Sequence, residues 1–390
     1  MPTRPGSEAG NALSQLSVGV IGTSWWADAM YLPALAARPE VRVTAVCGRD
    51  QDRARAFAER WSVPNVFTDA DRLLGSGLVE AVVVVTPNDT HRPVAGAALE
   101  RGLHVLCEKP LGLDHREADE LATAAAAAGV TTMVPFTYRF MPTTRFVKRL
   151  VDEGYLGRPH HLNLRFFSGY AMSGEYLWRF DVDRAGSGSL GDLGSHFLHL
   201  AEWFFGEIES VSCELGRMVD RPHPEGRDYR HADDSAVIAL GFAGGARGAI
   251  HASAVAHEPT GFGQLHEMDL HGSEGTLHHT IDWDRVQSVR GARVGGDGLQ
   301  ELVVPEDLWN GAPHGTVKET YHHVFRDQGL MVGDWVRAAA MGRRVRPDFE
   351  DGARVQRILD AAILSHQEGR RVRVAEAVGA SVAAERPAEA

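Results

Sequence analysis

The sequence predicts an α/β fold with a parallel sheet in its first third and a largely antiparallel sheet in the remainder. Short apolar runs alternate with helix-like segments up to residue 136, which is the pattern of parallel strands covered by helices on both faces. From residue 160 to residue 272, strand-like runs separated by Gly and Pro follow one another. With 390 residues, the chain is long enough for two or three domains.

In the first third, Asp50 and Asp114 stand where helix N-caps are expected, and Gly102 and Gly129 stand where helices end. Pro33 must lie near the start of its helix or kink it. These signals place the strands at residues 16–22, 41–48, 80–87, 104–110 and 130–136, and the helices at residues 26–39, 50–61, 88–102 and 114–129.

In the remainder, one long helix is expected at residues 189–206, where it is stopped by Gly206. Gly and Pro divide the other apolar runs, which favours antiparallel pairing. The strands are expected at residues 160–167, 210–219, 235–240, 245–255 and 266–272.

Ligands bind parallel sheets where the strands deliver their carboxyl ends. The first of these ends departs from the dinucleotide fingerprint G-x-G-x-x-G/A. Gly22 supplies the tight turn and Ala27 permits close helix packing, but Ser24 replaces the glycine that lets the backbone approach a pyrophosphate. The motif alone fits a plain strand-to-helix turn equally well, or a turn in which Ser24 donates its hydroxyl to a phosphate.

The second strand ends in Gly48-Arg49, where an acidic residue often binds the ribose hydroxyls of NAD. An arginine suits a 2′-phosphate instead. The sequence therefore favours NADP over NAD as the cofactor, with a solvated arginine at the start of a helix as the alternative.

Lys109 stands at another strand end, in "LHVLCEKPLG". It is one of three lysines among 40 basic residues; the others are Lys148 and Lys318. Arginine stays charged at any accessible pH, whereas lysine can exchange a proton when it is buried. A lysine kept in this place therefore indicates a functional ammonium, although a surface lysine is the simpler interpretation.

Composition excludes several classes of function. The formal charge of −12, with dispersed acids, argues against a nucleic-acid partner. Cys47, Cys107 and Cys213 are far apart, so neither a disulfide framework nor a thiolate zinc site is indicated. No stretch approaches the roughly 18 consecutive apolar residues of a membrane helix, and the first residues lack the apolar core of a signal peptide. A cytoplasmic protein without a membrane partner is expected.

Several segments together resemble the Gfo/Idh/MocA family, which includes glucose–fructose oxidoreductase and inositol dehydrogenase. They are "VGVIGTSWWADAMYLPAL", "TPNDTH", "CEKPLG", "YRFMP" and "YLWRFDVDRAGSGSLGDLGSHFLHLAEWFFG", in that order and spacing. The resemblance runs from about residue 16 to about residue 374. The combination of E-K-P with a downstream D-x-x-x-H is far more specific than either motif alone.

This resemblance implies a Rossmann NAD(P)-binding domain followed by an α/β domain with an open sheet, often used for oligomer contact. It implies a homo-oligomer, dimer or tetramer. The expected boundaries are a disordered tail at 1–14, the Rossmann domain at 15–138, the substrate and oligomerisation domain at 139–375, and a disordered tail at 376–390.

The resemblance further implies an NAD(P)-dependent oxidoreductase acting on a secondary alcohol or ketone of a sugar, cyclitol or glycoside. His196 would remove the hydroxyl proton, Lys109 would hold the reacting oxygen, and Asp192 would orient His196 or bind a neighbouring hydroxyl. Cofactor contacts are implied for Gly22, Ser24, Trp25, Trp26, Arg49, Thr86, Pro87, Asn88, His91, Glu108 and Lys109. Substrate contacts are implied for Tyr138, Arg139, Trp178 and Arg179.

The sequence also fits other interpretations. Asp192 and His196 share a helix face, which also fits an acidic first turn followed by a core histidine. His199 is expected to pack in the core. A metal site at these three residues fits their spacing but lacks a further ligand, so no metal is predicted. A glycosidase that uses a tightly held NAD and a non-catalytic regulatory protein on the same fold are the other two function classes.

Overall fold

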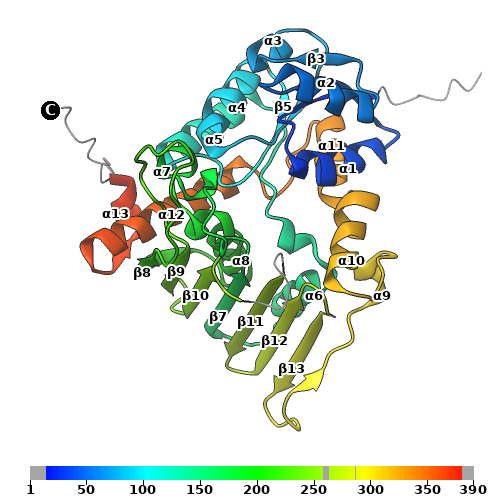
Figure 1. Cartoon of the computed structure of the whole chain (residues 1–390). Coiled ribbons are helices and arrows are strands. Elements are labelled where there is room, and N and C mark those ends of the chain that lie inside the picture. The colour runs from blue at the N-terminus through cyan, green and yellow to red at the C-terminus, as the bar shows by residue number, and fades with distance from the viewer. Residues whose placement is uncertain (1–14, 258–262, 286, 380–390) are drawn as a thin grey trace, which may run out of the picture.

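The computed structural model describes residues 15–257, 263–285 and 287–379. The α/β architecture expected from the sequence is confirmed. The protein has two sheets, one toward each end of the molecule (Figure 1). The expected tail at 1–14 lies outside the described residues, as does the part of the C-terminal tail from residue 380. Its expected start at residue 376 is wrong, because helix α13 (Val374–Gly379) continues to residue 379.

The first sheet is a six-stranded parallel sheet in the order β3-β2-β1-β4-β5-β6, which is the Rossmann order. Its central strands are buried on both faces. The strands are β1 (Leu16–Ile21), β2 (Val41–Cys47), β3 (Asn65–Phe67), β4 (Ala81–Val84), β5 (His104–Cys107) and β6 (Thr132–Met133). The helices between them are α1 (Leu32–Ala36), α2 (Gln51–Arg60), α3 (Ala70–Leu74), α4 (His91–Glu100) and α5 (His115–Ala128).

The first helix differs from a simple α-helix. A π-helical turn, Ala27–Tyr31, precedes α1, and Pro33 lies in the first turn of α1. Proline is tolerated there because the first amides of a helix have no intrahelical acceptor. The turn brings Trp26 and Tyr31 toward the end of β5, where they form part of the candidate site described below.

The second sheet has nine strands in the order β14-β13-β12-β11-β7-β10-β9-β8-β15. All neighbours pair antiparallel except β7 and β10, which are parallel. The strands are β7 (Pro159–Ser168), β8 (Ile208–Gly216), β9 (Ser235–Phe242), β10 (Arg247–Ser253), β11 (Gln264–Gly272), β12 (Gly275–Asp282), β13 (Ser288–Arg293), β14 (Gln300–Glu301) and β15 (Val372–Arg373).

Helices from this half of the chain cover one face of the second sheet and return to the first. They are α6 (Pro142–Asp152), α7 (Val182–Ala185), α8 (Ser195–Phe205), α9 (Glu306–Trp309), α10 (Val317–His322), α11 (Leu330–Ala340) and α12 (Phe349–Glu368). Figure 1 shows α11 beside α1, where Arg38 donates to the carbonyls of Gln328 and Gly329. In the described part of the chain, no helix is long and apolar enough to cross a membrane.

The long helix expected at residues 189–206 is present, although its first part is a π-helical turn, Leu190–Gly194, that continues directly into α8. α8 ends at Gly206, as expected. Asp192 lies within the π turn and His196 in the first turn of α8, facing the carboxyl end of β5. The segment after β5 and this helix therefore bring candidate residues of both halves together.

Candidate active site

The turn after β1 has the backbone of a tight, closely packed loop. Gly22 has a φ of +114°, and a Cβ added there would lie 2.1 Å from the carbonyl oxygen of Val85. Only glycine fits, because the conformation and the close approach both exclude a side chain. The hydroxyl of Ser24 accepts a hydrogen bond from the amide of Ala27 at 3.2 Å, which leaves its own proton available to a ligand.

Arg49, at the end of β2, is exposed and makes no hydrogen bond or ion pair with any described residue. Gly48 beside it is required by packing, since a Cβ would lie 2.8 Å from the hydroxyl of Thr23. The Arg49 guanidinium is thus free to bind an anion beside the first turn. The Arg49 guanidinium, the Ser24 hydroxyl and the turn at Gly22 lie at the carboxyl ends of neighbouring strands, which is where a parallel sheet binds its ligands.

Glu108, at the end of β5, is held by two aromatic donors from the π-helical turn. The indole of Trp26 donates to Oε1 at 2.8 Å and the hydroxyl of Tyr31 to the same atom at 2.6 Å. Oε2 accepts from the amide of Lys109 at 3.2 Å. Trp25, the neighbouring aromatic, is 65% exposed and packs edge-on against Trp26.

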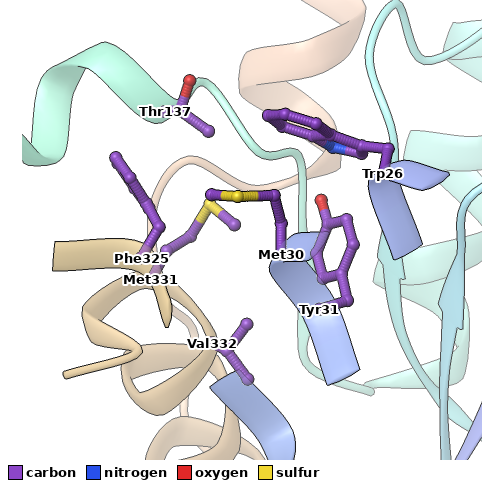
Figure 2. Close-up of a pocket in the computed structure, with 7 residues that line it drawn as sticks. All are labelled: Trp26, Met30, Tyr31, Thr137, Phe325, Met331 and Val332. Carbon is purple, nitrogen blue, oxygen red and sulfur yellow. The ribbon is translucent and has the colours of Figure 1, made fainter. Parts of the chain in front are cut away.

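Behind Glu108, the same aromatic residues border a small, largely apolar pocket. Figure 2 shows Trp26 and Tyr31 on one side and, on the other, residues of the π-helical turn η6 (His323–Asp327) and of α11. The pocket therefore lies between the turn after β1 and the C-terminal segment that contains α11. It is lined by Trp26, Met30, Tyr31, Thr137, Phe325, Met331 and Val332.

The turn after β4 contains Thr86, Pro87 and Asn88. The hydroxyl of Thr86 accepts from Thr90 at 2.7 Å. The side-chain amide of Asn88 donates to the carbonyl of Ala185 at 3.0 Å, so this turn is tied to the second half of the chain. The bond occupies one donor of Asn88, and the side chain is buried.

His91 does not present a surface to a cofactor, which corrects the expectation of a direct contact. Its side chain is fully buried, and its two ring nitrogens lie 2.8 Å from the carbonyl of Pro110 and 3.0 Å from that of Thr86. Burial lowers the pKa of the imidazole, so the ring is neutral and only one nitrogen donates. His91 braces the turns after β4 and β5 against each other.

Lys109 and Asp192 form the centre of the site. The ammonium of Lys109 donates to Oδ1 and to the backbone carbonyl of Asp192, both at 2.7 Å. Oδ2 accepts from the hydroxyl of Tyr170 at 2.7 Å, and the Arg179 guanidinium lies 3.6 Å from Oδ1. This carboxylate therefore joins a lysine of the first sheet to a helix of the second half.

The electrostatic balance keeps Asp192 ionised. Desolvation acts to raise the pKa of Asp192, but the Lys109 ammonium and the Arg179 guanidinium outweigh it and hold the pKa well below its usual range. The carboxylate is charged at any pH at which the protein would work. Asp192 therefore remains an anionic partner for Lys109.

His196 is a buried, neutral imidazole close to this pair. Its pKa is held well below the ordinary range, first by burial and then by the Lys109 ammonium. Nδ1 is buried without a hydrogen-bond partner, and the ring packs edge-on against Tyr138 at 4.9 Å. Asp192 directs its carboxylate to Lys109 and Tyr170 and makes no hydrogen bond to His196, so its expected orienting contact is absent from this structure.

The expected substrate residues fall into two groups. Tyr138 lies against His196 and donates to Gln264 at 2.6 Å. Arg179 lies over the ring of Trp178, 4.7 Å from its centroid, and reaches Asp192. Tyr138 therefore adjoins His196, Arg179 adjoins the Lys109–Asp192 pair, and Trp178 is linked to that pair through Arg179.

Arg139 is not brought to the site, which corrects its expected role. Its guanidinium donates to Nε2 of His199 at 3.0 Å and lies over the ring of Trp203, so it braces the far side of α8. His199 itself stacks on Phe136 with ring centroids 4.4 Å apart and packs in the core, as expected. Tyr138 and Arg139 are neighbours in a helical turn, so their side chains point in different directions. The sequence motif alone could not show that Tyr138, and not Arg139, reaches the site.

Two polar neighbours of the site were missed by sequence reasoning. Tyr170 lies in "SGYAMSG" and Gln264 at the start of β11, and neither belongs to a motif that would mark it. Their contacts join segments far apart in the chain. The described residues contain no group of three His, Cys, Asp or Glu side chains that could hold a metal ion.

Comparison with known proteins identifies relatives of the whole chain. Residues 16–136 match the model of the oxidoreductase family with an NAD-binding Rossmann fold, and residues 144–278 match the GFO/IDH/MocA C-terminal domain. An oxidoreductase domain protein from Kribbella flavida is 30% identical, with a TM-score of 0.80 over 93% of this chain and 99% of that one.

Two characterised relatives have names that describe an activity. Levoglucosan dehydrogenase of Pseudarthrobacter phenanthrenivorans is 26% identical over 90% of this chain and 94% of that protein. A structure of levoglucosan dehydrogenase with NADH and levoglucosan superimposes with a TM-score of 0.81, at 25% identity, over 93% of this chain and all of that one (100%). The NADP⁺-dependent scyllo-inositol 2-dehydrogenase of Bacillus subtilis is 30% identical over 50% of this chain and 60% of that protein.

Proposed function

We propose that this chain, which belongs to the Gfo/Idh/MocA family of NAD-binding oxidoreductases, interconverts a secondary alcohol and a ketone of a sugar, cyclitol or glycoside. The observation that carries the proposal is the meeting of Lys109, held by Asp192, with the neutral imidazole of His196 at the carboxyl end of a Rossmann strand. A fixed cation and a neutral base are the two groups that oxidation of an alcohol needs.

His196 is the proposed base. Because its imidazole is neutral, it can accept the proton of a substrate hydroxyl without first losing one of its own. A nicotinamide cofactor held by the Rossmann residues would supply the hydride acceptor for the carbon that carries this hydroxyl, and the hydride donor in the reverse direction. In the reverse direction the imidazolium of His196 donates the proton back to the oxygen.

Lys109 is proposed to hold the reacting oxygen. Two of its three N–H groups are directed at Asp192, and its side chain keeps 12% of its surface exposed. The third N–H is therefore available to a substrate oxygen, where an ammonium stabilises the charge of a developing alkoxide. Asp192 fixes the ammonium in this position and prevents it from adopting other rotamers.

A sugar-like substrate is supported by the names of the relatives and by the residues around the site. Levoglucosan and scyllo-inositol carry several vicinal oxygens, and the site offers the guanidinium of Arg179 as a donor and an aromatic face in Trp178, with Tyr138 beside His196. An aromatic ring can cover the apolar C–H face of a sugar while the donors bind its hydroxyls. We propose that residues 15–138 bind the cofactor and that residues 139–375 supply the substrate side.

NADP is the proposed preference over NAD, because the Arg49 guanidinium is free and lies beside the first turn. The relatives include both cofactors, one with NADH and one named for NADP⁺, so the family alone does not decide. The proposed cofactor contacts are Gly22, Ser24, Trp25, Trp26, Arg49, Thr86, Pro87, Asn88 and Glu108.

The function is tested by incubating the protein with a panel of sugars, inositols and anhydrosugars and with each nicotinamide cofactor, and recording the absorbance of the reduced cofactor. Stoichiometric release of free reduced cofactor with a ketone product is expected. A chain that cleaves glycosides with no net reduction would be the tightly NAD-bound glycosidase instead. Cofactor binding without turnover on any member of the panel would indicate a regulatory protein.

A further inference from the structure

A glycine-rich strap, residues 186–192, carries Asp192 from the second half of the chain to Lys109. It lies directly on the Rossmann domain: a Cβ at Gly186 would be 2.5 Å from the carbonyl of Leu113, and one at Gly191 would be 3.3 Å from the ring of Pro110. The strap is thus pressed against the segment that follows Lys109. Its own conformation decides where the carboxylate of Asp192 lies.

The opposite side of the strap is held by one residue, Asp233, just before β9. Its Oδ1 accepts from the amide of Gly188 at 2.8 Å, its Oδ2 from the amide of Leu190 at 2.7 Å, and its backbone carbonyl from the amide of Ser189 at 2.9 Å. Three consecutive amides of the strap therefore converge on Asp233. A Cβ at Gly188 would lie 1.7 Å from the Asp233 carbonyl, so the contact requires glycine there.

The link from this clamp to Asp192 is direct. The amide of Asp192 donates to the carbonyl of Gly188 at 2.8 Å, so the residue gripped by Asp233 also anchors the first turn of the helix that contains Asp192. Lys109 is bonded to both the carboxylate and the backbone carbonyl of Asp192. A shift of the strap would therefore move two of the acceptors that place the ammonium.

We propose that Asp233 is a positioning residue, which sets the carboxylate of Asp192 and through it the ammonium of Lys109. This inference rests on the proposed function and adds to it a residue that touches neither substrate nor cofactor. Asp233 acts by fixing the strap, because its two carboxylate oxygens accept from the backbone amides of Gly188 and Leu190 at the same time.

The environment of Asp233 argues against a role in simple ion pairing. Arg221, the buried cation of this region, already pairs with Asp234 at 3.0 Å, and Asp234 also accepts from the amides of Met218 and Val219. Burial raises the pKa of Asp233 to about 6, although the amides of Leu190 and Gly188 act to lower it. A buried carboxylate without a cation is unfavourable. The hydrogen bonds that Asp233 accepts from the strap amides offset this cost.

The test is the isosteric substitution Asp233→Asn, which replaces one acceptor by an NH₂ group that faces a backbone N–H. We expect kcat to fall roughly 10- to 100-fold, the size of a displacement near 1 Å, while the Kd for the nicotinamide cofactor stays the same. Asp183→Asn is the matched control: Asp183 is an exposed acid near the strap that pairs with Arg230, and its loss should leave kcat unchanged.

A double-mutant cycle separates positioning from a merely structural role. Because Asp233 acts through Asp192, Asp233→Asn should cost less than about threefold in kcat when it is added to Asp192→Asn, a clearly non-additive result. Hydrogen exchange needs no substrate: the amides of Gly188 and Leu190 should exchange roughly tenfold faster in Asp233→Asn at an unchanged global unfolding midpoint.

Additive losses in the cycle, or unchanged exchange in the strap, would overturn the inference while leaving the proposed function intact. Failure of the proposed function looks different, because the unmodified chain would then reduce no cofactor with any alcohol, or Lys109→Ala and His196→Ala would keep full activity. An Asp192→Asn variant with unchanged kcat would overturn the inference as well, since Asp233 would have nothing to position.

Discussion

At the scale of single residues, Lys109 is the position at which charge and geometry can be tested separately. Its compact ammonium donates to two oxygens of Asp192 and keeps one N–H for the substrate. A guanidinium is larger and planar, so it cannot make the same contacts in the same space. We expect Lys109→Arg to lower kcat/KM by about 10²-fold, nearly as much as Lys109→Ala.

The matched control is Lys148→Arg, since Lys148 pairs with Asp152 on the surface of α6 and should tolerate the exchange. Measuring kcat/KM for the three variants, together with the Kd for NADP(H), shows whether the site needs the ammonium itself or only a positive charge. Retention of more than about a tenth of the activity in Lys109→Arg would mean that the site needs only positive charge.

His196 should behave as a general base with a low pKa. His196→Ala is expected to lower kcat by roughly 10²–10⁴-fold without a change in cofactor affinity. Because burial and Lys109 lower the pKa of His196, the imidazole stays neutral below the ordinary histidine value of about 6.5. The activity of the unmodified chain should therefore persist into mildly acidic buffer. A loss of activity at low pH with its midpoint at or above that ordinary value would contradict this assignment.

Arg49 should discriminate between the two cofactors. Arg49→Ala is expected to weaken NADP(H) binding by roughly 10- to 100-fold, the size of a charged hydrogen bond, and to leave NAD(H) binding nearly unchanged. Arg53→Ala, on the exposed face of α2, is the control for a general loss of positive charge. Equal losses for both cofactors, measured by fluorescence titration, would remove the role in phosphate binding.

At the scale of elements, the sequence predicted most of the first sheet but missed much of the C-terminal part, including strand β12 and the long helix α12. Buried strands such as β4 and the caps at Asp114 and Gly129 follow from local patterns, and they are present. Strand β3 was missed, because its three half-buried residues carry no periodic signal. The π-helical turns were missed too, since nothing in "WADAMYL" or "SLGDLG" distinguishes them from α-helix.

Some residues of the candidate site could be predicted from the sequence, and some of their contacts could not. The motifs around Glu108, Lys109 and His196 could be found because each lies in a contiguous, recognisable segment. The partners of Asp192 could not, because its orientation toward Lys109 and Tyr170 depends on the strap and on side chains from three separate segments. Sequence spacing placed Asp192 and His196 on one face but said nothing about which neighbour the carboxylate would choose.

The contact between α5 and α12 gives a prediction about stability. Nδ1 and the backbone amide of His115 both lie 2.7 Å from Oδ2 of Asp360, and both side chains are buried. The hydrogen bond to Asp360 raises the pKa of His115. The ionic part of this contact is therefore fully present below the unfolded value of about 6.5 and is lost as the pH rises through the raised folded value.

His115→Ala should lower the free energy of unfolding by about 1–3 kcal/mol at mildly acidic pH, since it leaves a buried carboxylate without its partner. The loss should be smaller in alkaline buffer. Urea denaturation at several pH values measures both effects, and His160→Ala, at an exposed position near the start of β7, is the control. A loss that is independent of pH would show that the imidazole is not charged in the folded protein.

At the scale of the whole molecule, the candidate site depends on how the two halves are joined. Glu108 and Lys109 come from the first sheet, whereas Asp192 and His196 come from a helix of the second half. The strap, the Asn88 contact with Ala185 and the α5–α12 contact fix this arrangement. A rearrangement of one half relative to the other would separate the proposed base from the proposed oxygen-binding group.

The second sheet leaves one face without a covering helix in the described part of the chain. Along β9, Ala236, Ile238 and Leu240 point inward and are buried, so the apolar segment at residues 235–256 supplies less to the outer face than its composition suggests. What remains outside is Val237, 47% exposed, beside half-buried Phe167 and His251 on neighbouring strands.

We expect this outer face to pair with a second copy of the chain, giving a dimer or tetramer. A mixed surface of this kind suits a stable interface, which typically buries about 1,200–2,000 Å² with an apolar centre and a polar rim. Val237→Arg should place a charge near that centre and shift the protein toward monomer, whereas Val303→Arg, at a valine 85% exposed in a loop, should not. Light scattering at micromolar concentration measures the mass of each, and a value of 42.4 kDa for the unmodified chain would exclude the interface.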